Sequence, residues 1–331
     1  MRVHHWPAAT TKLAIALMLS AASAMAQPVP VIFDTDMGND VDDALALAML
    51  HALQSRGECR LIAVTVTKAN PWSAVYVDLV NTFYGRADIP VGMVSGGVTP
   101  DDSAMIRQPA QRRRPDGSLV YPRRLGSGGE APEAVALLRR VLSAETDGSV
   151  VIVQVGFSTN LARLLDDPAD LGLVRRKVRL LSMMAGNFAH SIPEFNVQQD
   201  PASARKLFDR WPGEIVASGY EIGTRLMFPA ARIERDFAWT RDHPVADAYR
   251  AYKPMPYDRP TWDLTAVLYA LRPGGGYFGI SPPGRITADD TGRTAFVQDP
   301  AGRHRYLILD DAQCARTLET MILLASQPLG K

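Results

Sequence analysis

The sequence contains few cysteines and almost no net charge. Only Cys59 and Cys314 occur among 331 residues, so at most one disulfide can form and the fold does not depend on a cysteine framework. No Cys/His spacing of the zinc type occurs. The 36 basic and 35 acidic side chains give a formal net charge of +1, which predicts neither a nucleic-acid partner nor a membrane-surface partner.

The apolar run Leu13–Ala22 is too short to span a membrane as a stable anchor. Basic residues precede it, and Ala24-Met25-Ala26 has the small-x-small form of a signal-peptidase site. We therefore expect residues 1–26 to be a signal peptide that is cleaved before Gln27. The mature protein, 27–331, is expected to be a single domain that is exported to the periplasm or secreted, with no membrane association after cleavage.

Several familiar nucleotide and catalytic signatures are also missing. There is no P-loop, and the glycine cluster 126–131 follows no strand, so it does not predict dinucleotide binding. The stretch 156–160 lacks the last glycine of a nucleophile elbow. Asp34-Thr35-Asp36 has the D-x-D form of haloacid-dehalogenase-type phosphatases, but Gly38 occupies the position where those enzymes need Thr or Val.

Short apolar runs alternate with helical stretches through most of the chain, which predicts an α/β fold. We expect an open, mostly parallel central sheet with helices on both faces and a small strand-rich excursion near the C-terminus. The expected strands are 31–33, 60–67, 89–94, 150–156, 178–184 and 214–218, with strand-like pieces over 274–309. The expected helices begin near 44 and 201 and cover 71–84, 131–144, 245–252, 262–271 and 310–326.

The polar segment 96–130 predicts a long loop. It carries a group of arginines, which we interpret as a solvated loop surface in preference to a phosphate site. These arginines are Arg112, Arg113, Arg114, Arg123 and Arg124.

Five aspartates directly follow the first expected strand. They are Asp34, Asp36, Asp40, Asp42 and Asp43, within ten residues, and an Ala/Leu-rich helical run begins at once. Close like charges near a surface repel by roughly 1 kcal/mol or more per pair. Aspartate at a helix N-terminus explains one or two of them. The whole group favours a divalent cation, because hard cations take oxygen ligands.

Other polar clusters follow the later strands. The carboxyl ends of parallel strands meet at one edge of a sheet, where ligands bind. We therefore expect these clusters to join the acidic loop at that edge: Asn70, Ser158-Thr159-Asn160, Asn187, Glu194 and Asn196.

This combination resembles the nucleoside hydrolase family, in particular exported bacterial members of the inosine-uridine-preferring type. The family's D-x-D, turn glycine and D-D-A-x-A match Asp34-Thr35-Asp36, Gly38 and Asp42-Asp43-Ala44-Leu45-Ala46. Its E-F-N and D-P elements match Glu194-Phe195-Asn196 and Asp200-Pro201. Its L-T-N element and its late aspartate match 158–160 and Asp263, in the right order along the chain.

The resemblance implies calcium-dependent hydrolysis of the N-glycosidic bond of ribonucleosides, releasing base and ribose. The metal positions implied are Asp36, Asp43, Asp263 and the backbone carbonyl of Thr159, and Asp36 would also accept the proton from the attacking water. The side chains implied to face the substrate are Asn39, Asp42, Asn70, Asn187, Glu194, Asn196 and Trp262. The resemblance also suggests a homodimer or homotetramer, by analogy only.

Three features depart from the family pattern. Asp40-Val41 look like additional residues in the acidic loop, which leaves the role of Asp40 open, and Asn70 lacks the usual glycine context. Trp262 stands where some members carry the histidine that protonates the leaving base. Tryptophan stacks on a base but donates no useful proton. Upstream candidates for that acid are His243, Tyr249, Tyr252 and Tyr257, each equally well explained as a packing or surface residue.

Two other functions fit the same residues. The first is a protein that binds a ribose-bearing ligand without turnover, which Trp262 favours. The second is a metal-dependent phosphohydrolase. The binding protein releases no product, and the phosphohydrolase releases phosphate while the base stays attached. A product assay therefore separates these two functions from nucleoside hydrolysis.

Overall fold

Strand β1 (Val29–Thr35) is buried along almost its whole length, as its continuous apolar sequence requires. It pairs in parallel with β2 (Cys59–Lys68) on one side and with β4 (Val150–Gln154) on the other. The computed structural model describes residues 1–3 and 27–329. The signal-peptide prediction depends on residues 4–26 and lies outside the described residues.

The predicted mostly parallel sheet is confirmed. Its order is β11-β10-β12-β6-β5-β4-β1-β2-β3, and the strands from β12 to β3 run parallel. The strand-rich C-terminal part adds β9, β10 and β11 in antiparallel fashion, while β7 and β8 form a separate pair. The remaining strands are β3 (Val91–Val98), β5 (Val178–Met184), β6 (Ile215–Ser218), β7 (Met227–Phe228), β8 (Arg259–Pro260), β9 (Gly279–Ile280), β10 (Gly284–Ala288), β11 (Thr294–Gln298) and β12 (His304–Ile308).

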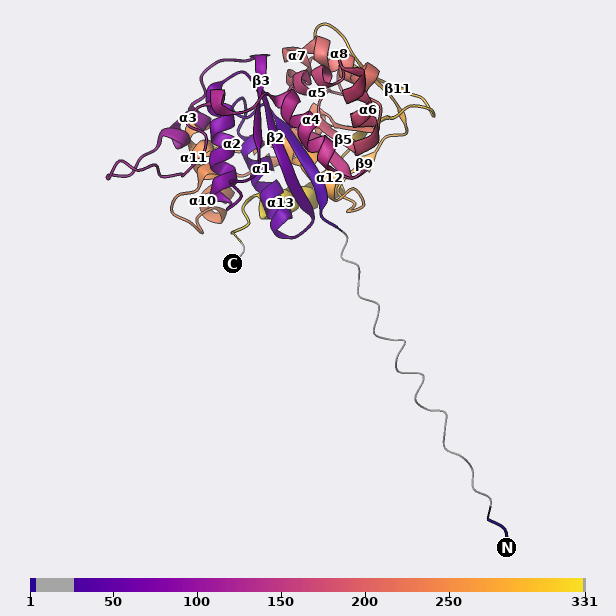
Figure 1. The fold of residues 1–331 in the computed structure, drawn as a ribbon, viewed down its shortest axis with the longest axis horizontal. Helices are drawn as coiled ribbons and strands as arrows, with labels where there is room; N and C mark the ends of the chain where they lie inside the picture. Colours follow the sequence, from indigo (N-terminus) through magenta and orange to yellow (C-terminus); the bar gives the residue numbers. More distant parts are fainter. Residues whose placement is uncertain (4–26, 330–331) are drawn as a thin grey trace.

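Helices cover both faces of the sheet (Figure 1). One apolar core lies between the sheet and α1, α2, α3, α11, α12 and α13, and a second lies between the opposite face and α4, α5, α6 and α8. The helices are α1 (Asp42–Ser55), α2 (Pro71–Phe83), α3 (Ala104–Gln111), α4 (Ala134–Ala144), α5 (Thr159–Leu164), α6 (Pro168–Lys177), α7 (Phe195–Gln199), α8 (Pro201–Arg210), α9 (Tyr220–Gly223), α10 (Ala230–Asp236), α11 (Pro244–Tyr252), α12 (Asp263–Leu271) and α13 (Asp311–Ala325).

The strand order reverses at β1. The chain moves from β1 outward through β2 and β3, then returns to place β4 on the other side of β1. Loops that leave β1 and β4 therefore diverge, and a crevice opens at their carboxyl ends, where open α/β sheets bind ligands. The acidic loop follows β1 at this point.

The segment 96–130 is not the continuous loop that its polarity predicts. It contains α3, an isolated bridge between Arg113 and Leu119, and a short 3-10 turn, Gly128–Glu130. Met105, Ile106 and the other buried residues of α3 lie on one face of the helix. The prediction failed because only a few apolar residues at helical spacing specify this helix within a mostly polar stretch.

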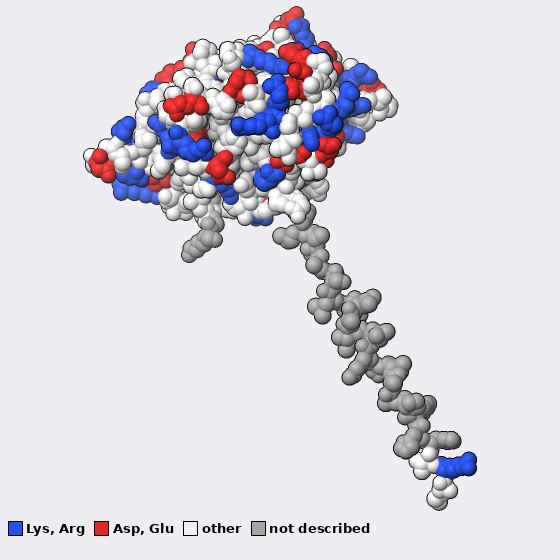
Figure 2. Space-filling model, in the orientation of Figure 1, with Lys and Arg blue, Asp and Glu red and all other residues white. Residues whose placement is uncertain are grey.

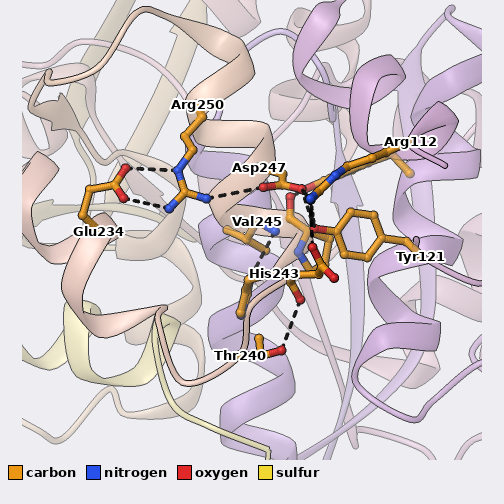
Figure 3. Close-up of polar contacts among 11 residues, drawn as sticks. Arg112, Tyr121, Glu234, Thr240, His243, Val245, Asp247 and Arg250 are labelled. Carbon is orange, nitrogen blue, oxygen red and sulfur yellow. Dashed lines mark hydrogen bonds and ion pairs between the residues drawn. The ribbon is translucent and has the colours of Figure 1, made fainter. Parts of the chain in front are cut away.

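The arginines of this segment bind protein groups. Figure 3 shows Asp247 of α11 facing Arg112, Tyr121 and Arg250, and the Nε and Nη2 atoms of Arg250 lie 3.0 and 2.8 Å from the carboxylate of Glu234. Arg113, Arg114, Arg123 and Arg124 each donate to backbone carbonyls. The network ties α3 to α11, whose last residue reaches the pocket described below.

Basic and acidic side chains are interspersed on the face shown in Figure 2. Within the described part of the chain, no helix has both the length and the apolar character needed to cross a bilayer. Cys59 is buried and Cys314 is partly buried, and both are free thiols in the structure.

Candidate functional site

A pocket of about 300 Å³ opens at the carboxyl edge of the sheet, beside the strand-order reversal. Its lining combines carboxylates with aromatic side chains. Eight of the eleven residues that the sequence predicted for the site line it: Asp36, Asn39, Asp42, Asp43, Glu194, Asn196, Trp262 and Asp263. The remaining lining residues are Asp40, Val155, Met184, Phe195, Tyr220, Tyr252 and Arg259.

Asp42, Asp43 and Asp263 form an acidic cluster in this lining. One carboxylate oxygen from each lies within 4.8 Å of the others. Asp42 Oδ2 accepts hydrogen bonds from the backbone N–H groups of Trp262 and Asp263, at 2.8 and 3.1 Å. The acidic loop therefore caps the N-terminus of α12 and brings Asp263 to the cluster, although the two segments are more than 200 residues apart.

The cluster has the donor set of a divalent cation site. The Thr35 hydroxyl donates to Asp43 Oδ1, but Asp43 Oδ2 is buried and has no hydrogen-bond partner among the described residues. Burial, reinforced by the neighbouring carboxylates, raises the pKa of Asp43 and of Asp263 well above the usual aspartate value. A buried carboxylate oxygen without a partner is costly, and a hard cation would satisfy it and offset the repulsion. These residues fit a hard divalent cation.

Asp36 is held at the pocket wall by Asn39. The Nδ2 group of Asn39 donates to Asp36 Oδ2 at 2.8 Å and to Thr99 Oγ1 at 3.2 Å. Lys68 Nζ in turn donates to Asn39 Oδ1 at 2.8 Å and to the Thr99 carbonyl at 2.8 Å. Burial raises the pKa of Asp36, and the Asn39 hydrogen bond opposes that rise. Asp36 therefore has a fixed orientation and a proton affinity suited to a general base.

Glu194 and Asn196 reach the pocket from the start of α7. The Glu194 carboxylate accepts from the backbone N–H groups of Gly186, Asn196 and Val197, at 3.0, 2.9 and 3.2 Å. Burial nevertheless raises the pKa of Glu194 to about 7. Asn196 Nδ2 donates to the Val155 carbonyl at 2.8 Å, so it joins this loop to the end of β4.

Another part of the pocket lining is aromatic. The rings of Tyr220 and Trp262 stack with their centroids 5.7 Å apart, and Trp262 Nε1 donates to the Tyr220 carbonyl at 2.9 Å. Gly223 allows this packing, because a Cβ there would lie 2.2 Å from the indole. Arg259 and Tyr252 complete the wall, and Asp40 forms an ion pair with Arg259. A flat heterocycle fits such a surface.

Three predicted site residues do not line this pocket. Asn70 caps α2, and its Nδ2 group donates to the carbonyls of Pro100 and Asp101. The Thr159 hydroxyl donates to Asp200 Oδ2 at 2.6 Å. Asn187 Oδ1 accepts from the His190 N–H, while its Nδ2 is buried without a partner among the described residues. Their assigned roles, and the assignment of Asp36 as a metal ligand, stay predictions.

Most of the suggested leaving-group acids lie away from the pocket. His243 is buried against Phe83, Phe237 and Trp239, with ring centroids 4.8 to 5.0 Å away. Tyr249 and Tyr257 stack, and each hydroxyl donates to the other residue's carbonyl. Tyr252 alone among these candidates lines the pocket.

Sequence reasoning missed Tyr220, Arg259 and Lys68. Tyr220 lies shortly after β6. Residues that follow parallel strands meet at the edge of the sheet where ligands bind, and this rule could have identified Tyr220. Lys68 is the last residue of β2, and the same rule applies to it. Arg259 begins the two-residue strand β8, which is antiparallel and too short for the sequence to carry such a signal.

Comparisons with known proteins agree on one family. The sequence profile of the inosine-uridine preferring nucleoside hydrolase family matches residues 31–316. The chain is 30% identical over 217 residues to the pyrimidine-specific ribonucleoside hydrolase RihA of Citrobacter koseri, an alignment that covers 62% of this chain and 65% of that protein. The similar Shewanella protein is 30% identical over 186 residues and is covered to 55% of its length. The chain thus spans less than two thirds of these curated relatives.

Solved structures share the fold. A plant nucleoside hydrolase superposes with a TM-score of 0.68 at 21% identity, covering 91% of this chain and 100% of that one. A purine-preferring ribonucleoside hydrolase from Gardnerella vaginalis superposes with a TM-score of 0.68 at 20% identity, covering 90% and 98%. At these identities the likeness concerns the fold.

Proposed function

Because the chain belongs to the inosine-uridine preferring nucleoside hydrolase family, we propose that it hydrolyses the N-glycosidic bond of ribonucleosides with the help of Ca²⁺. One observation carries the proposal. Buried oxygens of Asp42, Asp43 and Asp263 converge beside Asp36, in a pocket that aromatic side chains also line. This arrangement provides a polar place for a sugar and a flat place for a base.

In this mechanism Asp36 is the general base. Asn39 fixes one of its oxygens, and the carboxylate removes a proton from the attacking water as the water oxygen bonds to C1′ of the ribose. The bond between C1′ and the base nitrogen breaks, and its electron pair leaves with the base. Asp43 and Asp263 would hold the cation, and Asp42, which the family resemblance assigns to the sugar, lies close enough to join them. When bound, the cation lowers the pKa of water and positions the sugar hydroxyls.

Glu194 and Asn196 act on the sugar. Positive charge develops on the ribose ring as the base departs, and nearby carboxylate oxygens stabilise it. Glu194 accepts hydrogen bonds from three backbone N–H groups, which keep its carboxylate in place. The carboxylate therefore needs little reorganisation during the reaction.

The test is a product assay. Purified protein is incubated with purine and pyrimidine ribonucleosides, with Ca²⁺ or with a chelator, and free base and ribose are measured. We expect base release with Ca²⁺ and little with the chelator. An intact nucleoside panel in the presence of Ca²⁺ would refute the proposal.

The alternative of binding without turnover rests on Trp262, whose indole N–H is already bonded to the protein. Calorimetric binding of a ribonucleoside with no base released would support it. Release of phosphate from a nucleotide whose base stays attached would support a phosphohydrolase instead.

We also propose that the protein is exported after cleavage before Gln27. The basic start, the apolar run and the small-x-small site support this proposal. Mass spectrometry of the mature protein from a periplasmic or culture fraction tests it, and an intact residue 1–26 segment there would contradict it. Sedimentation analysis of the same sample tests the dimer or tetramer that family analogy suggests.

A further inference from the structure

Arg259 is the one cationic side chain that lines the pocket within the described part of the chain. Its guanidinium carbon lies 5.3 Å from the centroid of the Trp262 ring and 5.3 Å from that of Tyr252. The side chain is 18% exposed, so its charge is largely removed from water. Such a cation interacts more strongly with a charge that develops beside it than a solvated one does.

Asp40 holds this guanidinium in place. Arg259 Nε donates to Asp40 Oδ1 at 2.9 Å, and Nη2 donates to Asp40 Oδ2. Asp40 is one of the two residues that we interpret as an addition to the acidic loop of the family pattern. The two bonds occupy one edge of the guanidinium fork, which leaves Nη1 for another acceptor.

Trp262 and Tyr252, which contact the guanidinium of Arg259, are poor proton donors. The Trp262 N–H is used by the Tyr220 carbonyl. Burial, with the neighbouring charge of Asp40, raises the pKa of the Tyr252 hydroxyl to about 12. The interaction with Asp40 also raises the pKa of Arg259, which therefore stays charged.

The geometry points to Arg259 as the residue that stabilises the departing base, with Asp40 as the residue that positions it. This inference rests on the proposed function. When the bond from C1′ to the base nitrogen breaks, the electron pair stays on the base, and Arg259 donates a hydrogen bond to that base without losing a proton. The base then takes its proton from solvent, while Asp36 keeps the proton from the attacking water until product release.

The test compares two leaving groups. Uridine and inosine release a base that needs stabilisation, whereas 4-nitrophenyl β-D-ribofuranoside releases a phenolate that needs little. In Arg259→Met, which keeps the length of the side chain, we expect kcat/KM for the nucleosides to fall about 10²-fold or more, as for loss of one charge-stabilising donor. Turnover of the nitrophenyl riboside should fall less than about threefold.

Two further variants complete the design. Arg259→Lys keeps the charge but loses the fork, so it should give an intermediate loss confined to the nucleosides. Arg285→Met removes an exposed arginine that pairs with Asp299 away from the pocket and should leave both substrates unaffected. Circular dichroism and thermal melting check that each variant folds.

The outcomes are distinct. Selective loss on nucleosides supports the role of Arg259. Equal losses on both substrates, or unchanged nucleoside turnover, in a folded Arg259→Met or Arg259→Lys protein overturns it. If the unmodified protein releases base from the ribonucleosides, the hydrolase proposal stands even when the Arg259 inference fails. If it cleaves neither type of substrate, both are refuted.

Discussion

Lys68 Nζ lies 2.8 Å from Asn39 Oδ1, and Asn39 in turn holds the carboxylate of Asp36. The lysine is 2% exposed, and its aliphatic stem packs under the turn at Gly38. A residue at the end of β2 thereby fixes the orientation of the proposed general base on the neighbouring loop.

Replacing Lys68 should impair turnover through Asn39. In Lys68→Met we expect kcat to fall about tenfold, the usual range for loss of a supporting hydrogen bond, with a smaller change in KM. Steady-state kinetics on the best nucleoside measures this. Lys206→Met, which removes a partly exposed lysine paired with Asp166 outside the pocket, is the control. A Lys68→Met protein with unchanged kcat would mean that Asn39 needs no support.

Asp36→Asn tests the general base directly. The variant keeps the size and the hydrogen bond capacity of the side chain, so the fold should persist, while kcat should fall about 10³-fold. Single-turnover base release is the measurement. Asp290→Asn, at an aspartate that is 80% exposed, should behave as the unmodified protein. Near-normal rates in Asp36→Asn would place the base elsewhere.

Metal removal should lower stability as well as activity. The buried carboxylates of Asp42, Asp43 and Asp263 repel one another without a cation, so a chelator should lower Tm by roughly 5 °C and added Ca²⁺ should restore it. Differential scanning calorimetry with Ca²⁺ and Mg²⁺ compares the two ions. Asp43→Asn should lose most of the response. A Tm that is the same with chelator and with either ion would contradict the cation site.

Glu194 should make stability depend on pH. Its folded pKa is raised from 4.5 to about 7, so between these values the folded state binds more protons than the unfolded state. Stability from this group is therefore fully present below about pH 4.5 and is lost as pH rises through 7. The unfolding free energy of the unmodified protein, relative to Glu194→Gln, should fall by roughly 3 kcal/mol from pH 4.5 to 8.

This comparison is made by urea unfolding in the presence of chelator. Taking the difference between the two proteins removes the opposing effect of His51 and His243, whose pKa values are lowered by burial to about 3. A difference that does not change with pH would show that Glu194 titrates normally in the folded protein.

His243 should matter for stability and not for chemistry. It is 2% exposed and packs among aromatic rings at the start of α11. His243→Ala should lower the unfolding free energy by about 2 kcal/mol or more, with kcat per folded molecule unchanged. His190→Ala, in an exposed loop, is the matched control for stability. A lower kcat in a folded His243→Ala protein would show that this histidine is still a candidate for the acid that protonates the leaving base.

The sequence by itself determined the layered fold and the carboxylates that line the pocket. Continuous buried strands that alternate with helices permit little other than a parallel sheet, and the carboxyl ends of such strands share one edge. Residues in the segment between a parallel strand and the next helix, such as Asp36 after β1, are therefore located once the strand is located.

Only the tertiary structure decided which aromatic side chains line the pocket and which residues hold the site residues in place. The Asp40–Arg259 pair joins residues 219 positions apart, and α12 is placed by the hydrogen bonds that Asp42 accepts. Asn70 was assigned to the site by position, yet its side chain caps α2. Hydrophobic periodicity indicates which face of a helix or strand is buried. It does not indicate which distant residues a loop will contact, because those contacts depend on the packing of the whole chain.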